Sequence, residues 1–131
     1  MKQTEINTKS TGIRRLFLAF INSMKAFKWL LRNESAFKQE FVIALVAIPV
    51  ALWLPLRSIE QLLLILVLLL LMLAEILNTA IEAVVDRIGL EHHELSGLAK
   101  DLGSAAVFIA MVIALLTWLV IVTPVVMSSF S

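Results

Sequence analysis

Two glutamates in the middle of the sequence stand in surroundings where carboxylates are rare. Glu75 directly follows Leu62–Ala74, a run of thirteen residues without a polar side chain, and Glu82 comes seven residues later. At about 100° per residue, the two glutamates share one helical face with three other polar residues: Asn78, Thr79 and Asp86. In a membrane, an ionisable group at mid-depth costs at least ~2.5 kcal/mol on insertion scales. This face therefore requires a cation, a partner helix or a water-filled cleft.

The chemistry open to the two glutamates differs with their position along the chain. Glu75 lies among leucine and isoleucine, and desolvation makes a carboxylate a better proton acceptor, which suits a general base near neutral pH. Glu82 lies nearer the end of the apolar run, where it suits Mg²⁺, a cation that prefers a few carboxylates together with phosphate oxygens. The competing interpretation is a structural polar seam, favoured for Asn78 and Thr79 taken alone, in which they hydrogen-bond between helices.

Other charged residues flank the apolar runs. Glu34 and Glu40 precede or open the first run, and Lys100 and Asp101 precede the last. Acidic and basic groups beside a membrane surface suit a phosphorylated reactant, because lysine can hold phosphate and carboxylates can hold the metal. For Lys100–Asp101, a solvated loop pair is an equally good interpretation.

Common nucleotide and metal motifs do not occur in the sequence. Neither G-x-x-x-x-G-K-[ST] nor G-x-G-x-x-G is present. His92 and His93 are adjacent rather than four residues apart, and we interpret them as loop residues in preference to a metal site.

Composition indicates the setting of these residues. The chain has 131 residues, of which 60% are hydrophobic and 16% charged, against ~45–50% and ~25% in soluble domains. This is too little polar surface for a soluble domain. The absence of cysteine excludes disulfides and thiolate metal sites. We predict an all-α integral membrane protein with a single membrane domain over residues 1–131.

The pattern along the chain predicts five segments. Residues 1–12 are polar and are expected to be flexible. Residues 13–33 have apolar residues at three- and four-residue steps with basic residues between them, typical of an amphipathic helix on a membrane surface, although an ordinary helix packed on protein has the same pattern. Transmembrane helices are expected at 36–56, 61–85 and 104–126, with a polar loop at 86–103.

The distribution of basic residues predicts the orientation. Eight of the eleven lysines and arginines lie before residue 40. Basic segments are retained in the cytoplasm. The N-terminus and the loop at 86–103 are therefore expected on the cytoplasmic side, and the turn at 56–61 and the C-terminus outside.

Residues 75–87, Glu-Ile-Leu-Asn-Thr-Ala-Ile-Glu-Ala-Val-Val-Asp-Arg, closely resemble the signature of the prokaryotic diacylglycerol kinase family. The segment 93–107, His-Glu-Leu-Ser-Gly-x-Ala-Lys-Asp-x-Gly-Ser-Ala-Ala-Val, continues the resemblance without a gap. A weaker similarity covers Arg15, residues 33–40 and Trp118. Asn22 and Met24 depart from it, because better-known members carry aromatic residues there.

The resemblance implies a homotrimer in the bacterial inner membrane, with a surface helix and three transmembrane helices per subunit and active sites shared between neighbours. It implies transfer of the ATP γ-phosphate to the hydroxyl of diacylglycerol, which gives phosphatidic acid, with Mg²⁺ as cofactor. Glu75 resembles the general base, and Asn78 would orient the base and the phosphate. Glu34 and Glu82 resemble the Mg²⁺ ligands.

Two further sets of residues follow from the same resemblance. The nucleotide is expected at Arg15, Glu34, Glu82, Glu91, His92, His93, Lys100 and Asp101. The lipid is expected at Arg15, Glu40, Glu75, Ser104 and Trp118.

Three other functions are alternatives to a diacylglycerol kinase. A related branch of the family phosphorylates undecaprenol, although the sequence of residues 93–100 is more similar to the diacylglycerol branch. A proton- or cation-conducting oligomer could use a row of carboxylates, but polar residues would then be needed along the whole helix, and Leu62–Ala74 has none. A structural membrane subunit offers no reason for a glutamate at position 75.

Overall fold

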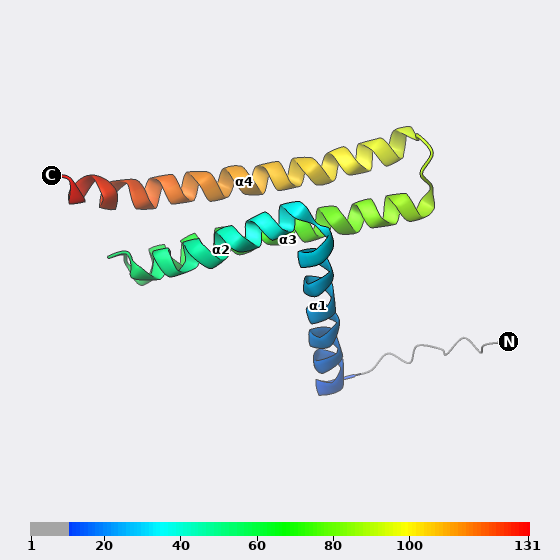
Figure 1. Cartoon of the computed structure of the whole chain (residues 1–131), viewed down its shortest axis with the longest axis horizontal. Coiled ribbons are helices and arrows are strands. Elements are labelled where there is room, and N and C mark those ends of the chain that lie inside the picture. Colours follow the sequence, from blue (N-terminus) through cyan, green and yellow to red (C-terminus); the bar gives the residue numbers. More distant parts are fainter. Residues whose placement is uncertain (1–10) are drawn as a thin grey trace. The chain divides into compact units, whose positions relative to one another are not determined.

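The computed structural model describes residues 11–131 and is all-helical over that range, which confirms the predicted fold class (Figure 1). Almost all of the segment 1–12, expected to be flexible, lies outside the described residues. The helices are α1 (Ile13–Asn33), α2 (Ser35–Trp53), α3 (Ser58–Ile88) and α4 (Glu94–Ser129). The chain divides after residue 35 into two compact units, so α1 is described separately from α2, α3 and α4.

α1 begins after Gly12, whose backbone adopts the left-handed conformation (φ 69°) that glycine enters without strain. The helix ends at Asn33, where the following residue turns to an extended conformation. The backbone N–H of that residue, Glu34, still donates to the Leu30 carbonyl oxygen at 2.9 Å. Arg14, Arg15 and the other basic residues of this segment therefore lie on a continuous helix of 21 residues.

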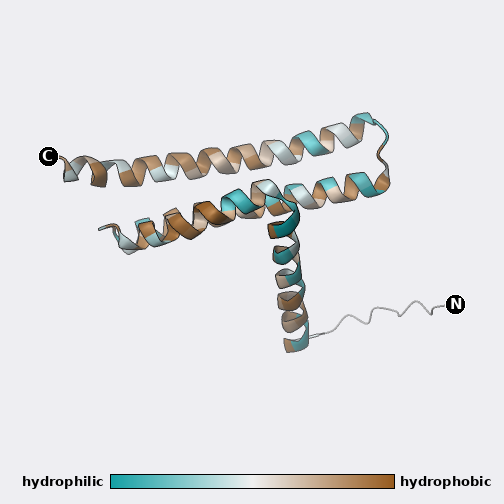
Figure 2. Cartoon of the chain, in the orientation of Figure 1, coloured by the Kyte–Doolittle hydropathy of each residue, from teal (hydrophilic) through white to brown (hydrophobic). Residues whose placement is uncertain are grey.

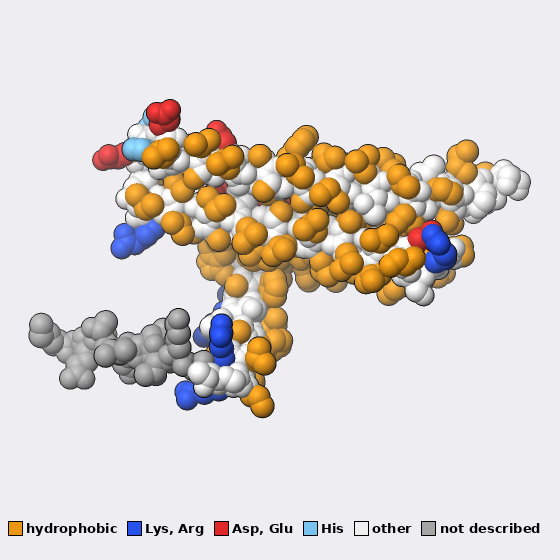
Figure 3. Space-filling view, turned by 180° about the vertical axis from the view of Figure 1, so that it is seen from behind, with side chains coloured by type: hydrophobic (Ala, Val, Ile, Leu, Met, Phe, Trp, Pro, Cys, Tyr) orange, Lys and Arg blue, Asp and Glu red, His pale blue; other side chains and the backbone are white. Residues whose placement is uncertain are grey.

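The other three helices are each long and apolar enough to cross a membrane, which makes the chain a multi-pass membrane protein. At 1.5 Å per residue, α2 is about 28 Å long, α3 about 46 Å and α4 about 54 Å. A hydrocarbon core is ~30 Å thick, so α3 and α4 are long enough to extend beyond it. Apolar residues dominate these helices (Figure 2), and their side chains cover the outer surface, whereas acidic and histidine side chains gather where α3 joins α4 (Figure 3).

Side chains of Arg57, Glu60 and Gln61 form the hydrogen bonds of the short turn between α2 and α3. Pro55 stands in this turn, where the chain leaves one helix and enters the next. The Arg57 backbone N–H donates to Glu60 Oε2 at 3.0 Å, and the Arg57 guanidinium pairs with Glu60 Oε1 at 3.1 Å. Gln61 Nε2 donates to the Leu52 carbonyl oxygen at 3.2 Å, which satisfies one of the free carbonyls at the end of α2.

α3 and α4 run antiparallel and lie side by side along most of their length (Figure 1). α3 buries leucines and valines, and the buried residues of α4 are small: Gly103, Ala110 and Ala114. Small residues let two helices approach closely in a membrane, where lipid gives no hydrophobic force between them. Trp118 Nε1 donates to the Leu64 carbonyl oxygen at 3.2 Å and joins the same two helices further along.

The polar loop expected at 86–103 is wrong as secondary structure. α3 continues through Asp86 to Ile88, and α4 begins at Glu94, so only residues 89–93 connect them. The prediction was wrong because the end of an apolar pattern shows only where a helix becomes polar. The helix itself can continue beyond that point. His93 caps α4, since its Nδ1 accepts from the Leu95 backbone N–H at 3.1 Å. The ranges 61–85 and 104–126 remain predictions of which parts lie in lipid.

Candidate functional site

The polar face of α3 is turned inward. Glu75, Asn78 and Thr79 are only 7%, 9% and 8% exposed, whereas Leu77 on the same helix is 56% exposed. In a soluble protein the leucine would be buried and the glutamate exposed. The inverted arrangement places the polar side chains between the helices and turns the apolar ones outward.

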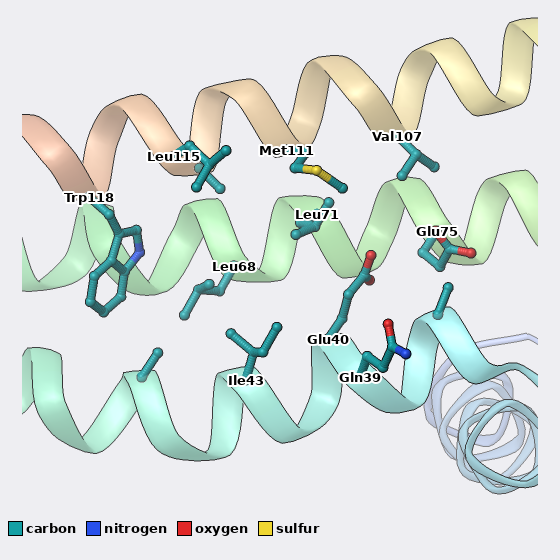
Figure 4. A pocket seen from close by; sticks show the side chains of 13 residues that line it. Gln39, Glu40, Ile43, Leu68, Leu71, Glu75, Val107, Met111, Leu115 and Trp118 are labelled. Atoms are coloured by element: carbon teal, nitrogen blue, oxygen red, sulfur yellow. The ribbon is translucent and has the colours of Figure 1, made fainter.

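A cavity of about 600 Å³ lies between α2, α3 and α4, and Glu75 lines it (Figure 4). Glu40 reaches into the same cavity from α2, close enough to interact electrostatically with Glu75. Glu75 lies toward one end of the cavity and Trp118 at the other (Figure 4). Most of the remaining lining is apolar: Ala36, Ile43, Ala47, Leu68, Leu71, Val107, Met111, Ala114 and Leu115. The cavity is thus a long apolar space with two carboxyl groups in it.

Asn78 connects this region to the next turn of α3 and to α4. Its Nδ2 donates to Glu82 Oε1 at 3.3 Å. Its Oδ1 is buried, has no hydrogen-bond partner among the described residues, and faces Gly103 so closely that a Cβ there would overlap it. The absence of a side chain at position 103 therefore allows Asn78 to lie between the two helices beside Glu82.

A second cavity, of about 290 Å³, lies at the junction of α3 and α4. Lys100 Nζ donates to Asp86 Oδ1 at 2.8 Å across the two helices, and both side chains are about half exposed. Lys100 also interacts electrostatically with Glu82. The cavity is lined by polar and small residues for the most part: Val85, Asp86, Gly89, Leu90, Glu91, His92, His93, Ser96, Gly97 and Lys100.

The structure brings the predicted residues together in two groups. Glu40, Glu75 and Trp118 line the first cavity. Glu91, His92, His93 and Lys100 line the second.

Six predicted residues fall outside these groups. Asn78 and Glu82 lie on α3, hydrogen-bonded to each other, and line neither cavity. Asp101 and Ser104 are exposed and line neither cavity. Arg15 and Glu34 belong to the unit that contains α1. Within residues 11–131, three or more histidine, aspartate or glutamate side chains nowhere converge as a metal site would require.

Sequence reasoning missed several residues of these cavities. The sequence predicts Asp86 on the polar face of α3 but indicates no role for it. The signal available was its spacing of four residues from Glu82, which makes the two side chains neighbours on that face. Gln39 and Ser96 line the cavities without any signal in their spacing. Gly103 had no signal either, because its role depends on which residue of α3 it faces.

The fold and the two cavities define a multi-pass helical membrane protein with buried carboxyl groups beside an apolar cavity. The sequence matches the family described as prokaryotic diacylglycerol kinase over residues 21–122. It is 51% identical over 112 residues to the diacylglycerol kinase of Escherichia coli (strain K12), covering 86% of this chain and 92% of that protein.

Two other relatives support the same assignment. The diacylglycerol kinase of Haemophilus influenzae is 46% identical over 110 residues, covering 84% of this chain and 93% of that protein. The diacylglycerol kinase of Pseudomonas aeruginosa is 45% identical over 108 residues, covering 82% and 88%. The chain belongs to the prokaryotic diacylglycerol kinase family, which confirms the resemblance seen in residues 75–87 and 93–107.

Proposed function

We propose that this protein transfers the γ-phosphoryl group of ATP to the free hydroxyl of diacylglycerol and releases phosphatidic acid and ADP. The observation that carries the proposal is the buried Glu75 carboxyl group in a largely apolar cavity between three helices. Such a cavity suits acyl chains, and a carboxylate in it suits a hydroxyl that must lose a proton. Kinship with proteins named diacylglycerol kinase supports the same substrate.

Glu75 acts as the general base in this proposal. The lipid hydroxyl oxygen attacks the γ-phosphorus while Glu75 takes the hydroxyl proton, and the bond from the γ-phosphorus to the ADP oxygen breaks. Glu40 and Trp118 contact the lipid along the cavity, and the exposed Ser104 of α4 contacts it outside the cavity. General base catalysis by a positioned carboxylate typically contributes ~10²–10⁴-fold to the rate.

The nucleotide binds at the second cavity. Lys100, with Asp101 beside it, holds phosphate, and Glu91, His92 and His93 line the space for the rest of the nucleotide. Glu82 lies seven residues from Glu75, about 10 Å along the helix axis. Asn78 is between them and hydrogen-bonded to Glu82. The phosphoryl group therefore passes beside Asn78 on its way from the nucleotide to the lipid.

Glu82 is the Mg²⁺ ligand that we propose on α3, and Glu34 is proposed as a second ligand from the resemblance alone. Two carboxylates are few for a cation, but Mg²⁺ in kinases commonly binds one or two carboxylates and completes its shell with phosphate oxygens and water. The donor set fits on chemical grounds, since Glu82 is a partly buried carboxylate oriented by Asn78. When bound, Mg²⁺ neutralises the charge of the phosphates during transfer.

The proposal includes the membrane setting of the protein. α1 lies on the cytoplasmic surface of the bacterial inner membrane, where Arg15 contacts phosphate or a lipid headgroup, and the N-terminus is cytoplasmic. The apolar side chains that α2, α3 and α4 expose are covered by lipid and by neighbouring copies in a homotrimer.

Glu75→Gln is the direct test. The variant protein in a lipid bilayer with Mg²⁺, ATP and diacylglycerol should lose turnover by about 10²-fold or more, with its oligomeric state unchanged. Glu60→Gln, in the first turn of the same helix, is the matched control and should keep full activity. Wild-type turnover by Glu75→Gln would refute the base assignment.

A second measurement separates the lipid substrates. Diacylglycerol and undecaprenol are offered in separate reactions, and phosphorylated lipid is measured. We expect phosphatidic acid from diacylglycerol. Product from undecaprenol alone would assign the chain to the other branch, and product from neither would refute the kinase proposal.

A further inference from the structure

The ion pair between Asp86 and Lys100 joins α3 to α4, and its aspartate has no role in the proposed reaction. Among residues 11–131, the structure gives only one other ion pair, Arg57–Glu60, and that pair lies within a single turn. Asp86 and Lys100 are fourteen residues apart, one near the end of α3 and the other near the start of α4. Their side chains meet at the wall of the second cavity.

We propose that Asp86 is a positioning residue, which fixes the Lys100 ammonium at the wall of the second cavity so that it can receive the phosphates of the nucleotide. The inference rests on the proposed function, in which this cavity binds the nucleotide. Asp86 itself does not contact the nucleotide in this proposal.

The chemistry of lysine explains why such a partner is needed. Lysine carries a point charge on a flexible four-carbon stem, and its side chain loses considerable rotamer freedom when it is held in one place. Lys100 is about half exposed, so packing alone does not hold it. Its ammonium has three donors. The bond of 2.8 Å to Asp86 Oδ1 uses one donor and leaves two for phosphate oxygens.

The position of the pair supports the same role. Glu82 lies one helical turn before Asp86 on α3 and also interacts electrostatically with Lys100. Glu82 is the proposed Mg²⁺ ligand. Lys100 is therefore held at the edge of the region where a phosphate chain bound to that metal would lie.

Asp86→Asn is the substitution that tests the proposal, because asparagine keeps the size of the side chain and removes the charge. Two effects on the KM for ATP oppose each other. Removing a carboxylate near the phosphates reduces repulsion and by itself lowers the KM, whereas releasing Lys100 raises it. If Asp86 positions Lys100, the KM for ATP rises about three- to fivefold, the range that a half-exposed ion pair can contribute. The kcat stays within about twofold of wild type, since the lost interaction is one of binding.

A double-mutant cycle with Lys100→Met separates this role from others. Lys100→Met alone should raise the KM for ATP by about tenfold or more, as expected when a charged hydrogen bond to phosphate is lost. Asp86→Asn added to Lys100→Met should raise the KM no further, because the residue it positions is gone. Asp86→Glu, which keeps the carboxylate, should recover part of the wild-type KM. Glu60→Gln breaks the other ion pair and controls for a general effect of removing a charge.

The outcomes distinguish the proposal from the function it rests on. If Lys100→Met raises the KM and Asp86→Asn leaves it unchanged or lowers it, the positioning role is overturned while the nucleotide site stands. If Lys100→Met itself leaves the KM for ATP unchanged, the nucleotide assignment of the second cavity fails, and the positioning role fails with it. A further rise in KM when Asp86→Asn is added to Lys100→Met would also overturn the proposal, because Asp86 would then act on something other than Lys100.

Discussion

Gly103 allows α4 to approach Asn78, and Gly103→Ala should therefore disturb the proposed path of the phosphoryl group more than it disturbs the fold. A Cβ at position 103 would overlap Asn78 Oδ1 and would lie 3.3 Å from Asn78 Cγ and 3.6 Å from Ile81 Cδ1. The atom that must move belongs to the end of a rotatable side chain, so we expect Asn78 to turn away while the helices stay paired.

The effect on stability is small because several terms partly cancel. Overpacking in a closed interior costs about 1–3 kcal/mol, with the lower end applying where the neighbour can rotate. Losing the Asn78–Glu82 hydrogen bond adds about 0.5–1.5 kcal/mol. Alanine in a helix is better than glycine by about 0.5–1 kcal/mol. With the lower end of the overpacking cost, the sum is a destabilisation of about 0.5–2 kcal/mol, which leaves the protein folded.

The effect on activity is larger. Asn78 is proposed to orient both Glu82 and the phosphate, and a displacement of ~1 Å in such a group can cost ~10²-fold in rate. We expect kcat for phosphatidic acid formation to fall by about 10- to 100-fold in purified Gly103→Ala, while the thermal transition in detergent falls only by the few degrees that this loss of stability implies. Gly97→Ala, on the same helix with no atom within 4 Å of the added Cβ, controls for the change in helix propensity and is compared by thermal stability alone.

The double variant Asn78→Ala with Gly103→Ala shows whether the overlap is the cause. Asn78→Ala removes the atom that the new methyl group would meet, so Gly103→Ala should cost no further stability in that background. Wild-type kcat in the Gly103→Ala variant would refute the reasoning. So would an equal loss of stability from Gly103→Ala with and without Asn78, because the added methyl group would then be meeting something else.

Two further outcomes follow from the described contacts. Trp118→Phe removes the Nε1 donor to the Leu64 carbonyl oxygen but keeps an aromatic ring, so we expect a loss of about 1 kcal/mol in stability, measured by thermal unfolding in detergent; an unchanged transition would show that the bond contributes nothing. Glu82→Gln should raise the Mg²⁺ concentration needed for half-maximal activity by about tenfold or more, measured by titrating Mg²⁺ at fixed ATP. An unchanged Mg²⁺ requirement would remove Glu82 from the metal site.

The sequence was sufficient for the helical class and for the polar face of α3. Both follow from periodicity, since Glu75, Asn78, Thr79 and Glu82 can share a face only if the segment is helical, and a membrane helix must turn such a face inward. The length of the helices was less accessible. Hydropathy marks the part of a helix that suits lipid. It does not show that the helix extends into a polar segment, as α4 does between Glu94 and Gly103.

Contacts between helices could not be predicted from the sequence, for a different reason. Gly103 and Asp86 matter because of what lies opposite them, and the angle and register at which two helices pair are set by many small packing terms at once. The pattern alone placed Lys100 in a loop, where a partner on α3 would not be expected. The ion pair with Asp86 requires Lys100 to lie on α4, one helix beside another.

The contacts along α3 also explain how a membrane helix can hold so many polar residues. Asn78 donates to Glu82, Glu82 interacts electrostatically with Lys100, and Lys100 pairs with Asp86. Each successive contact is nearer to the exposed end of α3, so the buried Asn78 belongs to a row of polar side chains that begins at half-exposed groups. A polar group that is isolated in lipid is expensive, but one that is joined to such a row shares its solvation. In the proposed function the same row leads from the nucleotide cavity toward Glu75, so the contacts that make Asn78 and Glu82 tolerable in the membrane would also line the path that a phosphoryl transfer from water to lipid requires.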